Sequence, residues 1–408
     1  MISPAALDPD LADAMIAARR RLHAYPELSN AEFETQAFIV EWLKSQGVGA
    51  ARPVAGAGAV IDVVGERSPS HRRIAIRADI DALPITEQSG EPFASCRPGV
   101  MHACGHDAHT AMGLAAAAHL HRRRAEFGGA ARFIFQPAEE AEPLGGRRVV
   151  YEERLLDDVD AVLGVHVDPY LETGKLGASS GSFTLASDTF DIVVRGKSAH
   201  AAKPHEGVDA IAIGCALVSE LQKLVSRETD PLDALIVSVT GFKGGGSYNV
   251  IADEVEMRGT IRSGRPETRA RAHHRLGALA GGLAASLGGE ASVHITTGEP
   301  SVQNDASLVA LIREAAPAGA FVALPGWTAA DDFGFYSELR PAAYFRLGVR
   351  NEKLGSVHPL HHPQFRIDEG ALALGATTLA AAAQMFLGAK SDSASLAPSQ
   401  EPNVRANG

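Results

Sequence analysis

Short apolar runs that end in polar residues recur through the first half of the chain. Three of them are Ile74–Ala78, Phe133–Phe135 and Ala161–Val165, and each is followed by acidic residues, glutamine or histidine. Runs of this length are typical of central strands. The stretch His102–Arg124 predicts a helix between two of them. Strands that alternate with helices favour an α/β domain with a mainly parallel sheet.

The two ends of the chain add helices to this pattern. Residues Leu11–Gly47 predict two helices separated by the turn Tyr25–Ser29, with Ser29 as the cap of the second helix. A strand-like run returns at Ala342–Leu347, and Asp368–Leu387 predicts a closing helix. The α/β pattern therefore extends over both ends of the chain.

Between residues 184 and 297 the pattern changes. Strand-like and helical runs follow one another there in the order βαββαβ, which is the ferredoxin-like arrangement: Thr189–Val194, Val208–Ser226, Ala234–Thr240, Glu254–Arg262, Pro266–Leu287 and Ala291–Thr297. We therefore expect an inserted α+β domain at 184–297 and a discontinuous α/β domain at 1–183 and 298–389. Residues 390–408, rich in Ser, Pro, Ala and Asn, predict a disordered tail.

Composition excludes several classes of protein. The 408 residues suffice for two domains, and the formal net charge of −11 argues against a nucleic-acid partner. No run approaches the ~18 apolar residues of a membrane span, and the first ten residues lack the features of a secretion signal. Three cysteines without regular spacing argue against a disulfide scaffold. We expect a cytoplasmic enzyme with neither a nucleic-acid nor a membrane partner.

The stretch Met101–Thr110 carries most of the candidate chemistry. It holds one thiol, three imidazoles and one carboxylate beside a glycine. These groups are the ligands that divalent transition ions prefer. Because Cys104 and His106 flank Gly105, both side chains can leave one tight turn toward a common point. The alternative is a buried free cysteine beside a capping histidine.

Other candidate ligands follow the predicted strands. Glu139 and Glu140 come after Phe133–Phe135, and His166 comes after Ala161–Val165. Ligands of such sheets bind outside the carboxyl ends of the strands, and neighbouring residues of extended chain point opposite ways. One glutamate can thus face a metal and the other the substrate. A surface carboxylate pair and a satisfied core histidine are the alternatives.

Three further side chains lie in predicted loops. His358–Pro363 holds three imidazoles, and this motif alone does not distinguish a ligand from a surface loop. His200, in the small-residue stretch Gly196–His205, could donate a hydrogen bond to a developing oxyanion. Asn249 is a candidate for binding a polar substrate group, with a turn asparagine as the alternative.

Taken together and in order, these stretches resemble the dinuclear metallohydrolase family of aminoacylases, glutamate carboxypeptidase and succinyl-diaminopimelate desuccinylase. The resemblance is greatest to the branch of hippurate hydrolases and auxin-conjugate amidohydrolases. It covers nearly the whole chain outside the tail and rests on these stretches: Arg21–Leu28, Arg77–Pro84, Met101–His109, Gln136–Glu140, Gly196–Ala202 and Leu360–Pro363.

The resemblance implies two divalent ions per subunit, manganese or zinc, with cobalt or nickel also suited to the donor atoms. The thiolate would bridge the two ions. The implied metal ligands are Cys104, His106, Glu140, His166 and His361. His361 is preferred over His358 and His362 because the family's histidine directly follows the leucine of this motif.

The resemblance also implies roles around the metals. Glu139 would be the general base, and Asp79 would orient a ligand from the second shell. His200 would stabilise the oxyanion, in its own subunit or across a dimer, and Asn249 would hold the carboxylate of the product amino acid. One departure is Asp331, which stands where the family usually has glutamate.

The implied reaction is cleavage of N-acyl-L-amino acids (hippurate-like, indole-3-acetyl or N-acetyl) to a carboxylic acid and a free amino acid. The inserted domain would act as a lid and as the contact of a homodimer or higher oligomer. Rival interpretations are a dipeptidase or carboxypeptidase, which usually carries aspartate in place of the Cys-Gly-His stretch, and a non-catalytic metal-binding protein, which would not need Glu139. A redox protein would need a Cys-x-x-Cys partner for Cys104.

Overall fold

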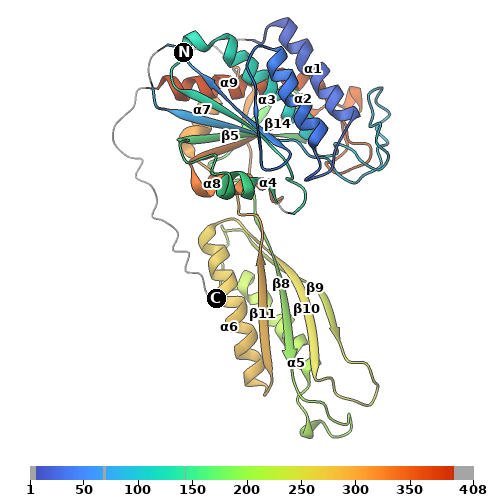
Figure 1. Ribbon diagram of the computed structural model, residues 1–408. Helices are drawn as coiled ribbons and strands as arrows, with labels where there is room; N and C mark the ends of the chain where they lie inside the picture. Colours follow the sequence, from blue (N-terminus) through green and yellow to red (C-terminus); the bar gives the residue numbers. More distant parts are fainter. Residues whose placement is uncertain (1–5, 68–69, 143, 390–408) are drawn as a thin grey trace.

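Two separate β-sheets organise the chain in the computed structural model, which describes residues 6–67, 70–142 and 144–389 (Figure 1). The larger sheet has ten strands, and its main path runs β1-β2-β4-β3-β5-β14-β12-β7, with β6 beside β14 and β13 beside β6. The neighbours from β4 to β12 on this path are parallel. The strands are Arg52–Val54 (β1), Gly58–Val64 (β2), Arg73–Asp79 (β3), Ala130–Gln136 (β4), Ala161–Glu172 (β5), Leu176–Ala178 (β6), Gly181–Ser182 (β7), Gln303–Asn304 (β12), Phe321–Ala323 (β13) and Ala342–Arg350 (β14).

Helices pack against this sheet or against one another beside it. The main ones are Pro9–Ala24 (α1), Phe33–Ser45 (α2), His106–Arg122 (α3), Ala306–Ala315 (α7) and Leu372–Gly388 (α9), and two short ones are Gly145–Arg147 (α4) and Gly334–Leu339 (α8). Helix α3 contacts β3, α1 and α9, so it is buried from His106 to Leu120. Its alanine-rich sequence allows these neighbours to approach closely. In Figure 1, α4 and α8 lie on the side of the sheet that faces the second sheet.

Helix α9, with the short helical turn before it, spans Glu369–Gly388. This is the one helix of the described residues that is long and apolar enough to cross a membrane. Within the fold, 61% of its apolar window is buried, which is typical of the core helix of a globular protein.

The smaller sheet has four strands in the order β11-β8-β10-β9, and all its neighbours are antiparallel. Its elements are Ala186–Arg195 (β8), Ala210–Ser226 (α5), Leu235–Gly244 (β9), Glu254–Ser263 (β10), Pro266–Ser286 (α6) and Glu290–Thr297 (β11). Alternate residues of β8 are buried, because one face of the sheet packs on α5 and α6. The predicted fold class, a mainly parallel α/β unit with an inserted ferredoxin-like unit, is confirmed.

Each sheet has its own apolar core. We propose residues 184–297 as the inserted domain and 1–183 with 298–389 as the catalytic domain. The predicted disordered tail, 390–408, lies outside the described residues.

Two local predictions were wrong. Ser29 does not cap α2: its hydroxyl donates to Asp81 at 2.7 Å, and the carboxylate of Glu27 accepts from the backbone N–H of Thr35 in the first turn of α2. The helix predicted from His102 begins instead at His106, after Gly105 in the left-handed conformation with φ 92°. A Cβ on Gly105 would lie 2.4 Å from a methyl of Val167, so this turn packs directly on β5.

Candidate metal centre

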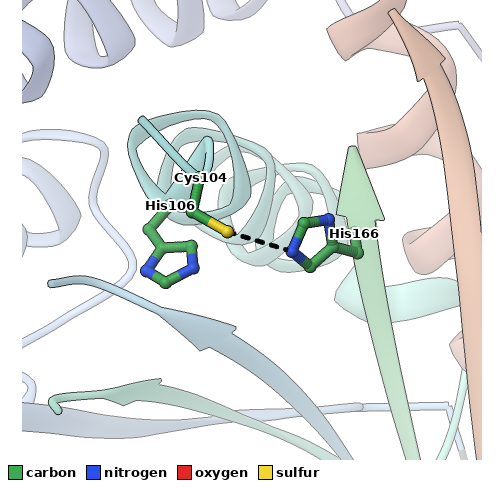
Figure 2. Close-up of side chains that lie close together, drawn as sticks. All are labelled: Cys104, His106 and His166. Atoms are coloured by element: carbon green, nitrogen blue, oxygen red, sulfur yellow. Dashed lines mark hydrogen bonds between the residues drawn. The ribbon is translucent and has the colours of Figure 1, made fainter. Parts of the chain in front are cut away.

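The candidate site lies at the carboxyl ends of the central parallel strands. Cys104 lies in the turn before α3, His106 begins this helix, and His166 belongs to β5 (Figure 2). The three side chains are buried, and one donor atom of each lies within 4.8 Å of the others. The Cys104 sulfur is 3.5 Å from Nε2 of His166. The structure thus brings three of the predicted ligands together.

The remaining predicted ligands join this cluster from two loops. Glu140 Oε1 lies 3.2 Å from Nε2 of His361 and 4.0 Å from Nε2 of His106. Cys104, Glu140 and His361 form a second group of donor atoms within 4.8 Å of one another. In contrast, His358 and His362 stack on each other with ring centroids 4.6 Å apart. The structure therefore places His361, rather than either neighbouring histidine, beside the thiol.

Hydrogen bonds determine which ring nitrogen faces the cluster. Nδ1 of His106 donates to the backbone and side-chain oxygens of Asp81, both at 3.0 Å, and Nδ1 of His166 donates to the carbonyl of Val167 at 2.7 Å. Both carbonyls can only accept, so Nδ1 carries a proton in each ring, and Nε2 is the nitrogen that faces the cluster and offers a lone pair when the ring is neutral.

Two buried atoms of the cluster lack a hydrogen-bond partner among the described residues. They are Nε2 of His106 and Oε1 of Glu140. Buried polar atoms are nearly always satisfied, so two such atoms 4.0 Å apart indicate a missing partner that both can bind. A divalent cation fits this position, because thiolate, imidazole and carboxylate are its preferred donors.

The pKa values of the cluster reflect an excess of negative charge. Burial, with the carboxylates of Glu140 and Glu139, raises the pKa of the Cys104 thiol well above its usual value. Burial lowers the pKa of His106, but the carboxylates of Asp79 and Asp81 outweigh it and raise this pKa to about 10. Without a cation, both groups therefore hold protons near neutral pH.

The pKa values of two other groups near the cluster are also shifted. Burial and the neighbouring His109 lower the pKa of His166 well below its usual value, which keeps that ring neutral. Burial, then Asp331 and Glu140, raise the pKa of Glu139 well above that of a free glutamate. The side chain of Glu139 is 11% exposed and lies 3.9 Å from Nε2 of His106, beside the donor cluster.

Asp79 was predicted to orient a metal ligand, which stays a prediction, and the neighbouring Asp81 contacts the predicted ligand His106 more closely. Asp79 accepts from Nδ1 of His109 at 2.6 Å and lies 3.8 Å from His106. Asp81 binds Nδ1 of His106 and also accepts from the backbone N–H of Glu140 at 2.9 Å. The spacing of two residues was a sign that both aspartates face the same side of extended chain.

A second set of side chains was missed or left out at the sequence level. The buried guanidinium of Arg77 pairs with Asp79 and with Asp332, and Asp332 also accepts from Gln136. Asp331 accepts from the hydroxyl of Tyr344 at 2.7 Å. Both Asp331 and Asp332 have a carboxylate oxygen within 4.8 Å of Glu139. The departure at Asp331 thus falls directly beside the predicted base.

Comparison with known proteins agrees with this site. Residues 75–385 match the model of peptidase family M20/M25/M40. The chain belongs to this family. It is therefore a hydrolase of the M20 type that acts on amide or peptide bonds, and the sequence-based resemblance is confirmed.

Several relatives within the M20 family cover nearly the whole chain. They include the N-acetyl-L-cysteine deacetylase of Bacillus subtilis (39% identity, 93% of this chain and 89% of the relative), thermostable carboxypeptidase 1 of Saccharolobus solfataricus (34%, 92% and 96%) and IAA-amino acid hydrolase ILR1-like 2 of Arabidopsis thaliana (36%, 96% and 89%). Among solved structures, the YXEP protein of Bacillus subtilis, described as a dinuclear metal-binding M20 peptidase, matches with a TM-score of 0.81 at 36% identity over 93% of this chain and 99% of its own.

Two predicted site residues, His200 and Asn249, do not lie near the metal-ligand cluster of their own chain. His200 follows the end of β8, and Asn249 follows the end of β9. Both strands run away from the larger sheet in Figure 1, so these residues lie at the far end of the inserted unit. There they are neighbours, because His200 forms a β-bridge with Val250 and the N–H of Ala201 donates to the carbonyl of Asn249 at 3.0 Å. Both side chains are exposed.

Metal binding by this M20 site is expected to release protons. An ion needs the thiolate of Cys104 and the neutral ring of His106, whereas the raised pKa of each group favours its protonated form. Affinity for zinc should therefore rise from about pH 6 to about pH 8, because hydroxide removes the competing protons. Calorimetric titration of metal-free protein in two buffers of different ionisation enthalpy measures the release. Zinc binding without proton release, at a pH-independent affinity, would contradict this prediction.

Proposed function

We propose that this protein hydrolyses the amide bond of N-acyl-L-amino acids to a carboxylic acid and a free amino acid. The observation that carries the proposal is the donor cluster of Cys104, His106, Glu140, His166 and His361 with the carboxylate of Glu139 beside it. Two relatives whose names describe a deacetylase of N-acetyl-L-cysteine and a hydrolase of IAA-amino acids support this substrate class. We further propose manganese or zinc as the metal, with cobalt or nickel as substitutes, and the cytoplasm as location.

Cys104, His106, Glu140, His166 and His361 would hold two divalent ions, and the sulfur of Cys104 belongs to both groups of three donor atoms. Bound ions of this kind polarise a carbonyl oxygen and lower the pKa of a water molecule. The protein contributes the rigidity of the site. Asp81 fixes the ring of His106 and the backbone of Glu140, so that two ligands from distant parts of the chain share one anchor.

Glu139 would move the proton. Its carboxylate would take a proton from the attacking water and return it to the leaving amine nitrogen, which has to leave as a neutral amine. Burial, with the carboxylates of Asp331 and Glu140, raises the pKa of Glu139 and so favours a form that holds this proton between the two steps. The pair of Arg77 with Asp332 balances part of the negative charge next to it.

His200 and Asn249 would serve the active site of a second copy of the chain. Their position at the far end of the inserted unit separates them from the metal cluster of their own chain (Figure 1). In a homodimer that pairs these units, His200 could donate to the oxyanion and Asn249 could hold the carboxylate of the substrate.

Mixing two inactive variants tests this arrangement. We expect that His200→Ala and Glu139→Gln are each nearly inactive alone. Mixed and allowed to exchange subunits, they should recover about a quarter of the wild-type activity or less, because in half of the dimers one site has both residues intact. Size-exclusion chromatography with light scattering verifies the dimer. No recovery after proven exchange would place His200 in its own chain's site or outside the reaction.

A substrate panel tests the function itself. Amino-acid release is measured from N-acetyl, N-benzoyl and N-indoleacetyl amino acids and from simple dipeptides, after loading with manganese, zinc, cobalt or nickel. We expect cleavage of acyl amino acids that chelator abolishes and added metal restores. The thermostable carboxypeptidase relative makes peptide cleavage the alternative. Release from dipeptides alone would favour it, and no release from any compound would favour a non-catalytic metal-binding protein.

A further inference from the structure

We propose that His109 is a positioning residue that holds the metal ligand His166 through the backbone of Val167. This inference rests on the proposed metal site and assigns a function to the third imidazole of the Met101–Thr110 stretch. His109 is fully buried on α3, three residues after His106 and therefore on the same face of the helix. Its ring centroid lies 4.6 Å from that of His166.

Both ring nitrogens of His109 are already engaged. Nε2 accepts a hydrogen bond from the backbone N–H of Val167 at 2.9 Å, and Nδ1 donates to Asp79 at 2.6 Å. A backbone N–H can only donate, so Nε2 carries no proton and Nδ1 does. This tautomer leaves no lone pair for a metal. His109 is therefore not a ligand, although it lies in a group of possible donors with Asp79 and His106.

The position of Val167 explains why this contact matters. Strand β3 pairs with β5 only as far as Gly164, so the backbone of Val167 lies beyond the last residue that β3 reaches. Buried backbone groups need partners. The ring of His109 accepts from the N–H of Val167, and the ring of His166 donates to its carbonyl. At Val167 the two rings thus take the place of β3, His109 at the N–H and His166 at the carbonyl, while β14 pairs with the other edge of β5.

The two imidazole ligands are consequently held in different ways. His106 is fixed by the carboxylate of Asp81, whereas His166 donates to the carbonyl of the residue that directly follows it. The direction of this carbonyl depends on the backbone of Val167, which His109 holds. Asp79 fixes the ring of His109 in turn, and Arg77 pairs with Asp79. Outer contacts of this kind typically contribute 10–100-fold to metal affinity.

Two substitutions separate the two hydrogen bonds of the His109 ring, one with Val167 and one with Asp79. In His109→Gln, an amide oxygen can replace Nε2 and accept from Val167. In His109→Asn, the amide can reach only Asp79 and leaves the Val167 N–H without its acceptor. We expect His109→Asn to bind one or both zinc ions about 10–100-fold more weakly in competition with a chromophoric chelator, and to change the visible spectrum of the cobalt-loaded protein. His109→Gln should retain most of the wild-type affinity and spectrum.

The outcomes distinguish this inference from the proposed function. Wild-type affinity and spectrum in His109→Asn, or equal weakening in both variants, would overturn the positioning role. Melting of the metal-free proteins separates a loss of stability alone from a loss of metal affinity. Nitrogen NMR of histidine in the wild-type protein gives a test that needs no variant, because a protonated Nε2 on His109 would also overturn the inference. A wild-type protein that binds no ion would overturn the proposed function as well.

Discussion

Glu139→Gln is expected to reduce turnover of an N-acyl amino acid by about a hundredfold or more while the protein still binds its metals. Glutamine keeps the shape of the side chain but cannot accept a proton from water or return it to the amine. Glu139 is not needed to complete either group of donor atoms that contains Cys104. Removing its carboxyl therefore affects the reaction more than the metal centre.

Steady-state kinetics together with metal analysis tests this expectation. Glu142→Gln is the matched control, because it makes the same exchange at an exposed residue three positions along the chain. We expect the control to retain wild-type kcat. Turnover close to wild type in Glu139→Gln would remove it as the base. Loss of metal in that variant would instead make Glu139 a ligand.

Cys104→Ser is expected to weaken the binding of both ions. The sulfur belongs to one donor group with His106 and His166 and to another with Glu140 and His361, so it is shared by both halves of the cluster. A serine hydroxyl is a poor substitute for a thiolate. Loss of an outer contact already costs about 10–100-fold in affinity, and loss of a shared ligand should cost more at each ion.

The stoichiometry of bound zinc after dialysis, followed by competition titration, measures this effect. Cys215→Ser is the matched control, because Cys215 is an exposed free cysteine on α5, far along the chain from the donor cluster. The control should bind metal as the wild type does. Two ions bound at wild-type affinity in Cys104→Ser would exclude the thiolate as a bridge.

The Asp79-Ile-Asp81 segment shows which features of the site the sequence pattern predicted and which it did not. The apolar run before it correctly predicted a strand, and the parallel order correctly predicted that its polar end would meet those of β4 and β5. Which aspartate binds which histidine depends on where α3 crosses the strand ends. This crossing is a long-range arrangement, and the local pattern of neither segment predicts it.

By itself, the sequence determined the two kinds of sheet and the family, because these depend on local periodicity and on short runs such as Cys104-Gly-His106. The resemblance to the family then predicted the set of donor side chains. The tertiary structure decided the rest. It placed His361 rather than His358 beside Glu140 and brought His109 into a hydrogen bond with the backbone of Val167. It also placed His200 and Asn249 beyond the ends of β8 and β9, two strands that run away from the larger sheet (Figure 1). These outcomes depend on hydrogen bonds and burial between segments up to hundreds of residues apart. Such contacts exist only after the chain has folded.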